Sequence, residues 1–510
     1  MKNLLLILLL IGINNNYKSQ ITELSPEEYL KREDYLNALV GFKMQHHKNP
    51  KKINLLKKIG SCILKCNIDR SRASRYFKDY LKEKPKDKDV WILLCHSYLY
   101  GFKFEKAREA IDGYMLNNGK NKKLILKTLE QIEIREKLYY ANQNISIKNL
   151  GNKVNSSKME TCPYVDLDEK FIIYTSNKEG SKGNLQPNGS YNKDIYVSRY
   201  NGLFFQKNKA LRTLNTNQNE KIIGVDQQAT FLYYKNINPL AKTETPIIMQ
   251  AKKRGLNYKK KKLFREIGID KKMILNYIFL NDQHDKCFIS AKNQGEKNYY
   301  KIYELNKLPN QSWGNPKPIQ EINFDGNNIA PYFHSASNTM YFSSDNEQGM
   351  GGYDLYKTTY NLIEGSWSNP ENLGYPVNSP YDEKNISFNK DGNKAFISSI
   401  RPGGLGNYDI YQLDFLDKTV KRAVYIVGVY NKVNEQKIFD AEIEIYNNHD
   451  ILIGQYLANE ISGNFSLILE SGKYRLNCIL DGETLLKKEL IVTDFDIQKE
   501  NKKLRLNIER

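Results

Sequence analysis

A regular repeat in the middle of the 510-residue chain limits the folds that the chain can adopt. Five short segments of alternating polar and apolar residues recur there at nearly even spacing, with equivalent positions at Tyr196, Met249, Tyr303, Tyr356 and Tyr411. Such alternation predicts β-strands. A period of this kind, built from short strands, is typical of a β-propeller with one four-stranded blade per period. Residues 144–418 hold five periods, so we predict five blades.

A second internal match supports a ring of related units. Residues 150–176 align without a gap on residues 373–399, and the identical pairs run from Leu150 with Leu373 to Ser176 with Ser399. The offset between the two segments is close to four periods. The first and last units are therefore closely related, as expected of a ring that arose by duplication.

The glycine-rich stretch 343–358, SSDNEQGMGGYDLYKT, raises the question of a phosphate-binding loop. Phosphate loops lead into a helix N-terminus, whereas this stretch leads into a predicted strand. We therefore expect a turn between the second and third strands of the fourth blade, with glycines that allow positive φ and with Asp354 bonded to the turn backbone. The predicted blade markers, all structural, are Asp194, Tyr196, Asp354, Tyr356, Asp409 and Tyr411. Arg401, in the same loop of the last blade, is the candidate rim contact.

Residues 21–143 contain a different, helical repeat. Ala38, Ala73 and Ala107 recur at nearly equal spacing, and each is followed one helical turn later by a large apolar residue. This pattern resembles the tetratricopeptide repeat, in which a small residue lets two antiparallel helices pack closely. The resemblance implies an array with a concave surface suited to peptides or protein segments.

Two further resemblances cover the rest of the chain. The segments YFSSDNEQGMGGYDLY (341–356) and FISSIRPGGLGNYDIY (396–411) resemble the WD-like propeller repeat of TolB-type periplasmic proteins. Residues 420–510 read as alternating strands, and Gly463-x-Phe465 with Gly472-x-Tyr474 resembles the carboxypeptidase-regulatory or transthyretin-like domain. The expected fold is therefore multidomain α + β: a helical array, a propeller and a small β-sandwich.

The N-terminal residues 1–20 have the order of a secretory signal peptide. Lys2 is followed by an apolar run and then by polar residues, and the run is too short to span a membrane. Because the first cysteine is Cys62, we expect no lipidated cysteine after this signal. We expect an exported protein that lies in the periplasm, peripheral to the outer membrane.

The net charge of +19 has its densest cluster at residues 251–265. Basic residues mixed with aromatic residues can bind nucleic acid, but export argues against that partner. Two alternatives for this cluster remain open: it is a solvated loop or edge strand, or it contacts an acidic partner in the cell envelope.

The sequence lacks the common patterns for catalysis and metal binding. The sequence has no HExxH and no GxSxG, and its six histidines are not spaced as metal ligands. We therefore predict no catalytic residues, no cofactor, no metal and no enzymatic activity. The six cysteines are expected to be free core thiols, with a bridge between Cys66 and Cys95 as the alternative.

The order of these parts resembles the PorE-type envelope proteins of Bacteroidetes, which are associated with type IX secretion and gliding. The resemblance implies a periplasmic scaffold with an outer-membrane partner of the PorP/SprF type. Such proteins usually continue into an OmpA-type peptidoglycan-binding domain, which is not seen before the final LRLNIER, so peptidoglycan binding is not carried over. The alternative function is a sensor whose propeller binds a glycan or a peptide.

Overall fold

The computed structural model describes residues 24–510 with gaps, and it is a mixed α/β structure. The gaps lie at 142–143, 184, 186–189, 239–246, 256, 265–266, 268–272, 282, 296–298, 362–363, 417–422, 448–449, 470–471, 494–501 and 510. The predicted signal peptide, 1–20, lies outside the described residues. The chain divides into two compact units, unit 1 at residues 1–415 and unit 2 at residues 416–510.

Unit 1 begins with helices in which consecutive members pack against each other. The side chains of Ala38, Ala73 and Ala107 are fully buried, and so are Phe42 and Phe77 one turn later. Small residues at these positions let the helix axes approach closely. The helices are α2 (Pro26–Lys31), α3 (Tyr35–Lys48), α4 (Asn54–Lys65), α5 (Ala73–Glu83), α6 (Lys88–Leu99), α7 (Phe104–Leu116) and α8 (Lys122–Tyr140), with a 3₁₀ turn at Arg70–Arg72.

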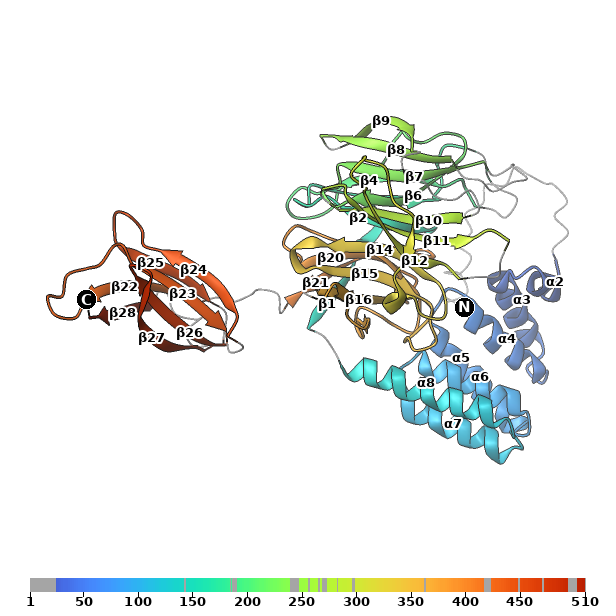
Figure 1. Cartoon of the computed structure of the whole chain (residues 1–510). Coiled ribbons are helices and arrows are strands. Elements are labelled where there is room, and N and C mark those ends of the chain that lie inside the picture. The colour runs from blue at the N-terminus through green and yellow to red at the C-terminus, as the bar shows by residue number, and fades with distance from the viewer. Residues whose placement is uncertain are drawn as a thin grey trace. The chain divides into compact units, whose positions relative to one another are not determined.

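Five groups of antiparallel strands follow (Figure 1). The first three are β2 (Glu160–Val165), β3 (Phe171–Ser176), β4 (Asp194–Arg199) and β5 (Lys209–Ala210); β6 (Asn219–Asp226), β7 (Phe231–Ile237), β8 (Ile247–Arg254) and β9 (Asn257–Leu263); and β10 (Met273–Leu280), β11 (Lys286–Asn293), β12 (Lys301–Asn306) and β13 (Lys317–Pro318). The last two are β14 (Asn328–His334), β15 (Thr339–Ser344), β16 (Asp354–Asn361), β17 (Ser366–Trp367) and β18 (Glu371–Asn372); and β19 (Glu383–Phe388), β20 (Lys394–Ser399) and β21 (Asp409–Phe415) with β1 (Ile145–Asn149).

The five groups close into a ring, which is the arrangement of a β-propeller. The inner strands β2, β6, β10, β14 and β19 contact one another in this order, and β19 contacts β2. The last group is completed by β1, which precedes all the others in the chain and pairs with β21 from Ile145↔Phe415 to Asn149↔Tyr411. The second and third groups also share a short parallel pairing of β6 with β10, where a Cβ on Gly224 would lie 1.6 Å from the carbonyl oxygen of Ile278.

An asparagine joins neighbouring blades at four places; the side chain is buried at three of them and half-buried at Asn323. Each one lies just before the inner strand of a blade and bonds both the backbone N–H and the C=O of one residue in the third strand of the preceding blade. For Asn155, the Oδ1 accepts from the Ile410 N–H at 2.8 Å and the Nδ2 donates to its carbonyl at 3.0 Å. The four pairs are Asn155 with Ile410, Asn215 with Ile195, Asn323 with Ile302, and Asn378 with Leu355.

All five inner strands shift their register at an equivalent place near their middle. In three of them a residue with positive φ lies at the shift: Cys162, Ala330 and Asn385. The buried Tyr277 of the third blade reaches the Cys162 Sγ of the first blade, with 3.8 Å between the thiol and the phenol oxygen. Because these blades are not neighbours, the Tyr277 side chain reaches across the middle of the ring.

The basic cluster 251–265 lies in the outer hairpin of the second blade. Strand β9 is the edge strand of its sheet, and its Tyr258 is buried with the hydroxyl donating to the Ala229 carbonyl at 2.6 Å. The aromatic residue of the cluster therefore serves the core, while the lysines line an edge strand, where charge discourages pairing with other chains.

Unit 2 holds a three-stranded and a four-stranded sheet that share one hydrophobic core. The strands are β22 (Ala423–Asn431), β23 (Glu442–Asn447), β24 (Leu452–Leu457), β25 (Asn464–Leu469), β26 (Gly472–Leu480), β27 (Glu483–Val492) and β28 (Lys502–Ile508).

All six cysteines of the chain are buried and free, including Cys66 and Cys95. Among the described helices, none combines the length and the apolar character that crossing a membrane requires.

Replacing Asn155 by alanine is predicted to destabilise unit 1. The change removes the acceptor of the buried Ile410 N–H, which costs about 2 kcal/mol in the free energy of unfolding. The Ile410 carbonyl keeps its hydrogen bond from the Leu150 N–H. Urea unfolding followed by circular dichroism measures the loss. The exposed Asn37→Ala serves as the control and should change stability by less than about 1 kcal/mol. Equal losses in the two variants would contradict the role given to the asparagine.

Candidate functional site

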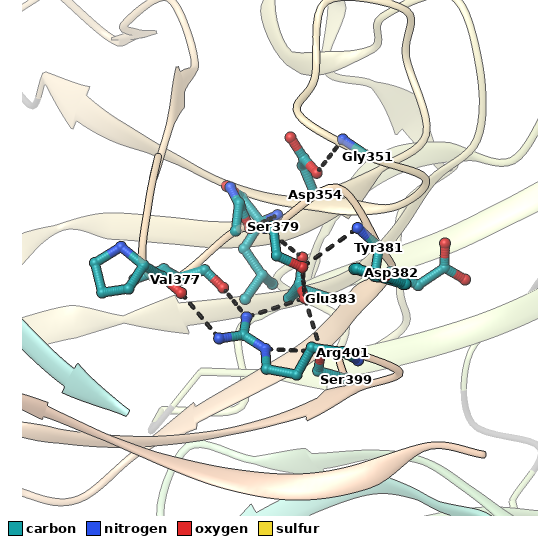
Figure 2. Close-up of polar contacts among 12 residues, drawn as sticks. Gly351, Asp354, Val377, Ser379, Tyr381, Asp382, Glu383, Ser399 and Arg401 are labelled. Carbon is teal, nitrogen blue, oxygen red and sulfur yellow. Dashed lines mark hydrogen bonds and ion pairs between the residues drawn. The ribbon is translucent and has the colours of Figure 1, made fainter. Parts of the chain in front are cut away.

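The aspartates of the repeated strand hold the loops that precede it, as Figure 2 shows for Asp354 and Gly351. Asp354 accepts hydrogen bonds from the backbone N–H groups of Met350 and Gly351, and from Asn372 Nδ2 at 2.7 Å. Asp409 makes the same set of contacts in the last blade, with the N–H groups of Leu405 and Gly406 and with Asn149 Nδ2. Asp194 in the first blade accepts from the Lys182 N–H at 2.8 Å. Both carboxylate oxygens of Asp354 and of Asp409 accept hydrogen bonds, which gives these two residues a structural role. The Oδ1 of Asp194 is buried and has no hydrogen-bond partner among the described residues.

The tyrosines that follow these aspartates pack inside the blades. Tyr196, Tyr356 and Tyr411 are buried, and the ring of Tyr356 stacks on Phe342 with 5.7 Å between centroids. Burial raises the pKa of Tyr196 and Tyr356 to about 12.

The glycines of the stretch 343–358 are required for a different reason than the one predicted. Gly349, Gly351 and Gly352 are not among the residues with positive φ. A Cβ on Gly351 would instead lie 2.2 Å from the Tyr381 carbonyl oxygen, in the segment that leads into the next blade. Gly406 in the last blade meets the Lys158 carbonyl oxygen in the same way, at 2.0 Å. Close packing between blades excludes a side chain here.

Arg401 is not available as a rim contact, because its guanidinium is used inside the protein (Figure 2). Its side chain is 11% exposed and donates to the carbonyl oxygens of Pro376 and Val377, to Ser399 Oγ and to Glu383 Oε1. The buried Glu383 also accepts from Ser399 Oγ at 2.7 Å. The sequence prediction of Arg401 as a recognition residue is therefore corrected: it neutralises a buried carboxylate.

The buried glutamate recurs in other blades, which marks it as part of the architecture. Glu160 and Glu220 accept from the backbone N–H and the side-chain hydroxyl of Ser156 and Thr216, respectively. Burial raises the pKa of Glu220 to about 6, and it also raises the pKa of Glu160.

Unit 1 is predicted to lose stability as the pH rises from about 4 to about 7. Burial, followed by repulsion from Glu383, raises the pKa of Asp354 to about 7. The folded state then holds a proton that the unfolded chain has released above about pH 4, so the stabilising contribution is present below pH 4 and is lost as the pH passes 7. Urea unfolding of the protein and of Asp354→Asn, at fixed ionic strength between pH 4.5 and 7.5, measures this contribution.

The asparagine variant cannot titrate, so the stability advantage of the parent protein over Asp354→Asn should shrink as the pH rises. The exposed Asp168→Asn is the control and should give a difference from the parent that is independent of pH across this range. A parent-to-Asp354→Asn difference that stays constant with pH would contradict the assignment.

A groove between α8 and the propeller is the site with the greatest room for a ligand among the cavities described. Its volume is about 770 Å³. One wall is α8, and the other is built from loops of the third and fourth blades. The lining residues are Lys127, Glu130, Gln131, Ile134, Tyr299, Phe324, Asp325, Gly326, Asp345, Asn346, Glu347 and Gln348.

The groove is acidic although the chain as a whole carries a net charge of +19. Its lining has four carboxylates and one ammonium group, that of Lys127, which pairs with Glu347. Asp345 is held in place by the backbone N–H and the Nδ2 of Asn327, at 2.6 and 2.8 Å. Asp325 and Tyr299 are exposed, Tyr299 to 54%.

Direct contacts within unit 1 fix the helices to the propeller. The Arg70 N–H donates to the Tyr381 hydroxyl at 3.0 Å, and the Arg70 guanidinium lies over the Tyr381 ring. Nearer the groove, the Tyr375 N–H donates to the Leu138 carbonyl, and the rings of Tyr139 and Tyr375 lie 4.9 Å apart. The wall formed by α8 is therefore anchored at its C-terminal end.

Sequence reasoning missed this groove, although part of it lies in the stretch that it singled out. Asp345, Glu347 and Gln348 precede the glycines of 343–358. The available signal was that acidic residues in this loop contrast with the basic chain. Their meeting with α8, which comes much earlier in the sequence, depends on the packing of the helices on the ring.

No family model matches the chain, and no curated protein matches it. Similar solved structures include a sialidase of Trypanosoma rangeli (8% identity, TM-score 0.31, 53% of this chain and 60% of that one). They also include a thermostable family-43 glycoside hydrolase (14%, 0.33, 52% and 91%) and the Bombyx mori GH32 β-fructofuranosidase BmSUC1 (8%, 0.33, 74% and 94%). The chain spans about 60% of the length of the sialidase.

These neighbours are enzymes, so the prediction that the chain has no enzymatic activity is contradicted and is withdrawn. Likeness at this level assigns no reaction, substrate or catalytic residue to the chain. Within the described residues, no group of three or more His, Cys, Asp or Glu side chains is arranged to hold a metal ion.

Proposed function

We propose that the protein is a scaffold that holds a positively charged segment of another protein in the groove between α8 and the propeller. The observation that carries the proposal is an acidic cavity of about 770 Å³ in a strongly basic chain. Carboxylates bind lysine and arginine side chains by charge-assisted hydrogen bonds, and exposed aromatic rings attract the same cations. Asp325, Asp345 and Tyr299 supply these groups on the propeller side.

The finer identities of the flanking parts belong to this proposal. We assign the helices of unit 1 to the tetratricopeptide class, supported by the buried small residues Ala38, Ala73 and Ala107. We assign unit 2 to the carboxypeptidase-regulatory or transthyretin-like class, supported by its two sheets around one core. Both classes are used for binding or spacing, which fits a scaffold.

The cellular setting is proposed from the sequence resemblance. The protein acts in the periplasm at the outer membrane, as an accessory component of type IX secretion or gliding. Its partner is an envelope protein, for which an outer-membrane protein of the PorP/SprF type is the first candidate. Nucleic acid and peptidoglycan are not proposed as ligands.

A second candidate function rests on a smaller cavity of about 400 Å³ at the opposite end of the ring. Residues of four blades line it, among them Asp168, Gln227, His334 and Lys390. Convergent polar groups beside the rings of Tyr332 and Phe333 suit a saccharide or a short peptide. A rise in Tm with cell-wall oligosaccharides would favour this function.

Site-directed photo-crosslinking tests the scaffold. A photoreactive residue at Gln348, in the groove, is expected to form an adduct with an envelope protein when cells are irradiated. The same residue at Gln206, exposed on the first blade, is the matched control and should give no such adduct. The combined variant Asp325→Lys and Glu347→Lys should abolish the Gln348 adduct, because it reverses the charge of the groove. The absence of any adduct at Gln348 would reject the scaffold proposal.

Purified protein gives a second measurement. A labelled lysine-rich peptide is expected to bind more tightly than a glutamate-rich peptide of equal length, with affinity that falls as salt rises. Asp325→Lys with Glu347→Lys should weaken binding by at least about tenfold. Equal binding of both peptides would contradict charge recognition in the groove.

A further inference from the structure

Three lysines gather at the end of the ring where the inner strands begin. Lys221 and Lys384 occupy equivalent positions in the inner strands β6 and β19, each directly after a buried glutamate of the architecture. Lys193 immediately precedes β4, and its carbonyl accepts from the Glu220 N–H at 2.7 Å, which places its backbone beside that of Lys221. The inner strands begin at this end, so the lysines lie on the face that carries the loops between second and third strands.

Aromatic side chains lie next to the lysines in the middle of the ring. The Lys221 ammonium lies 4.7 Å from the centre of the Tyr277 ring, and Tyr277 crosses the ring to reach Cys162. Tyr164 of β2 and Tyr332 of β14 are also buried. A molecule that enters from this face therefore meets ammonium groups above an aromatic floor.

The charges of this cluster are only partly balanced. Lys384 lies 3.2 Å from the carboxylate of Asp382 and donates to the Tyr408 hydroxyl at 2.7 Å. In the described part of the chain, no carboxylate lies within ion-pair distance of the Lys193 or Lys221 ammonium groups, and neither group has a hydrogen-bond acceptor. Burial and the charge of Lys221 lower the pKa of Lys193. Gathering like charges away from water costs free energy unless an anion balances them.

We propose that Lys193, Lys221 and Lys384 form a binding site for a phosphate group at this end of the ring. Two unbalanced ammonium groups match the two negative charges of a phosphate, and each ammonium offers up to three donors to its oxygens. Asp382 fixes Lys384 from the side, and the Tyr408 hydroxyl bonded to both adds a polar group at the edge. None of these residues lines the acidic groove, so this site does not depend on the scaffold function.

Isothermal titration calorimetry with inorganic phosphate, at constant ionic strength and pH 7.5, tests the site. Lys193→Gln and Lys221→Gln should each weaken binding by at least about tenfold. Lys390→Gln, in the cavity at the opposite end of the ring, is the matched control and should bind as the parent does. Lys221→Arg keeps the charge and should retain binding. Failure of phosphate to bind the parent protein, or equal binding by the glutamine variants, would overturn the proposal.

A parallel titration with glycerol 3-phosphate distinguishes the source of the phosphate. Binding of the ester as tight as that of the free ion indicates a phosphomonoester ligand, and binding of the free ion alone indicates inorganic phosphate. Thermal unfolding adds a readout that a purely structural lysine would not give. Phosphate should raise the Tm of the parent and of Lys390→Gln but not that of Lys221→Gln, and Lys221→Gln should not be less stable than the parent in chloride buffer.

Discussion

The pairing of β1 with β21 is the interaction on which the ring depends. It joins Ile145 and Phe415, which stand at the two ends of the propeller sequence, and supplies the outer strand that the last blade lacks. The clamp of Asn155 on Ile410 secures the same junction from the inside. Without this closure the first and last blades would present unpaired strand edges. The buried Tyr277 in the middle of the ring would then be exposed to water.

Closure of the ring also explains how two oppositely charged sites share one face. The loops between second and third strands are held at fixed angles by Asp354 and Asp409, so their variable residues are free to differ in charge. Near α8 these residues form an acidic groove, while the ring centre presents lysines. A rigid frame with variable loops is the usual way in which a propeller acquires binding sites.

Much of the ring could be predicted from the sequence, because each blade repeats the same short sequence pattern. The spacing of Tyr356 and Tyr411 and the recurrence of Asp354 and Asp409 locate strands and loops without any tertiary information. The roles of Arg401 and Gly351 could not be predicted from these patterns, because each residue contacts backbone carbonyl oxygens of a neighbouring segment. The groove could not be predicted for the same reason, because its walls are α8 and loops that lie far from α8 in the sequence.

The strand pair that closes the ring has a mechanical consequence. Ile145 is the first residue of β1 and Phe415 the last of β21, and the two face each other in one rung. The chain from the helices and the chain toward unit 2 thus leave the propeller at the same end of an antiparallel pair. A force between unit 2 and the helices would first break the contacts that hold the helices on the ring. It would then separate β1 from β21 one residue pair at a time, starting at Ile145 and Phe415. The last blade would then be the first part of the propeller to respond to tension.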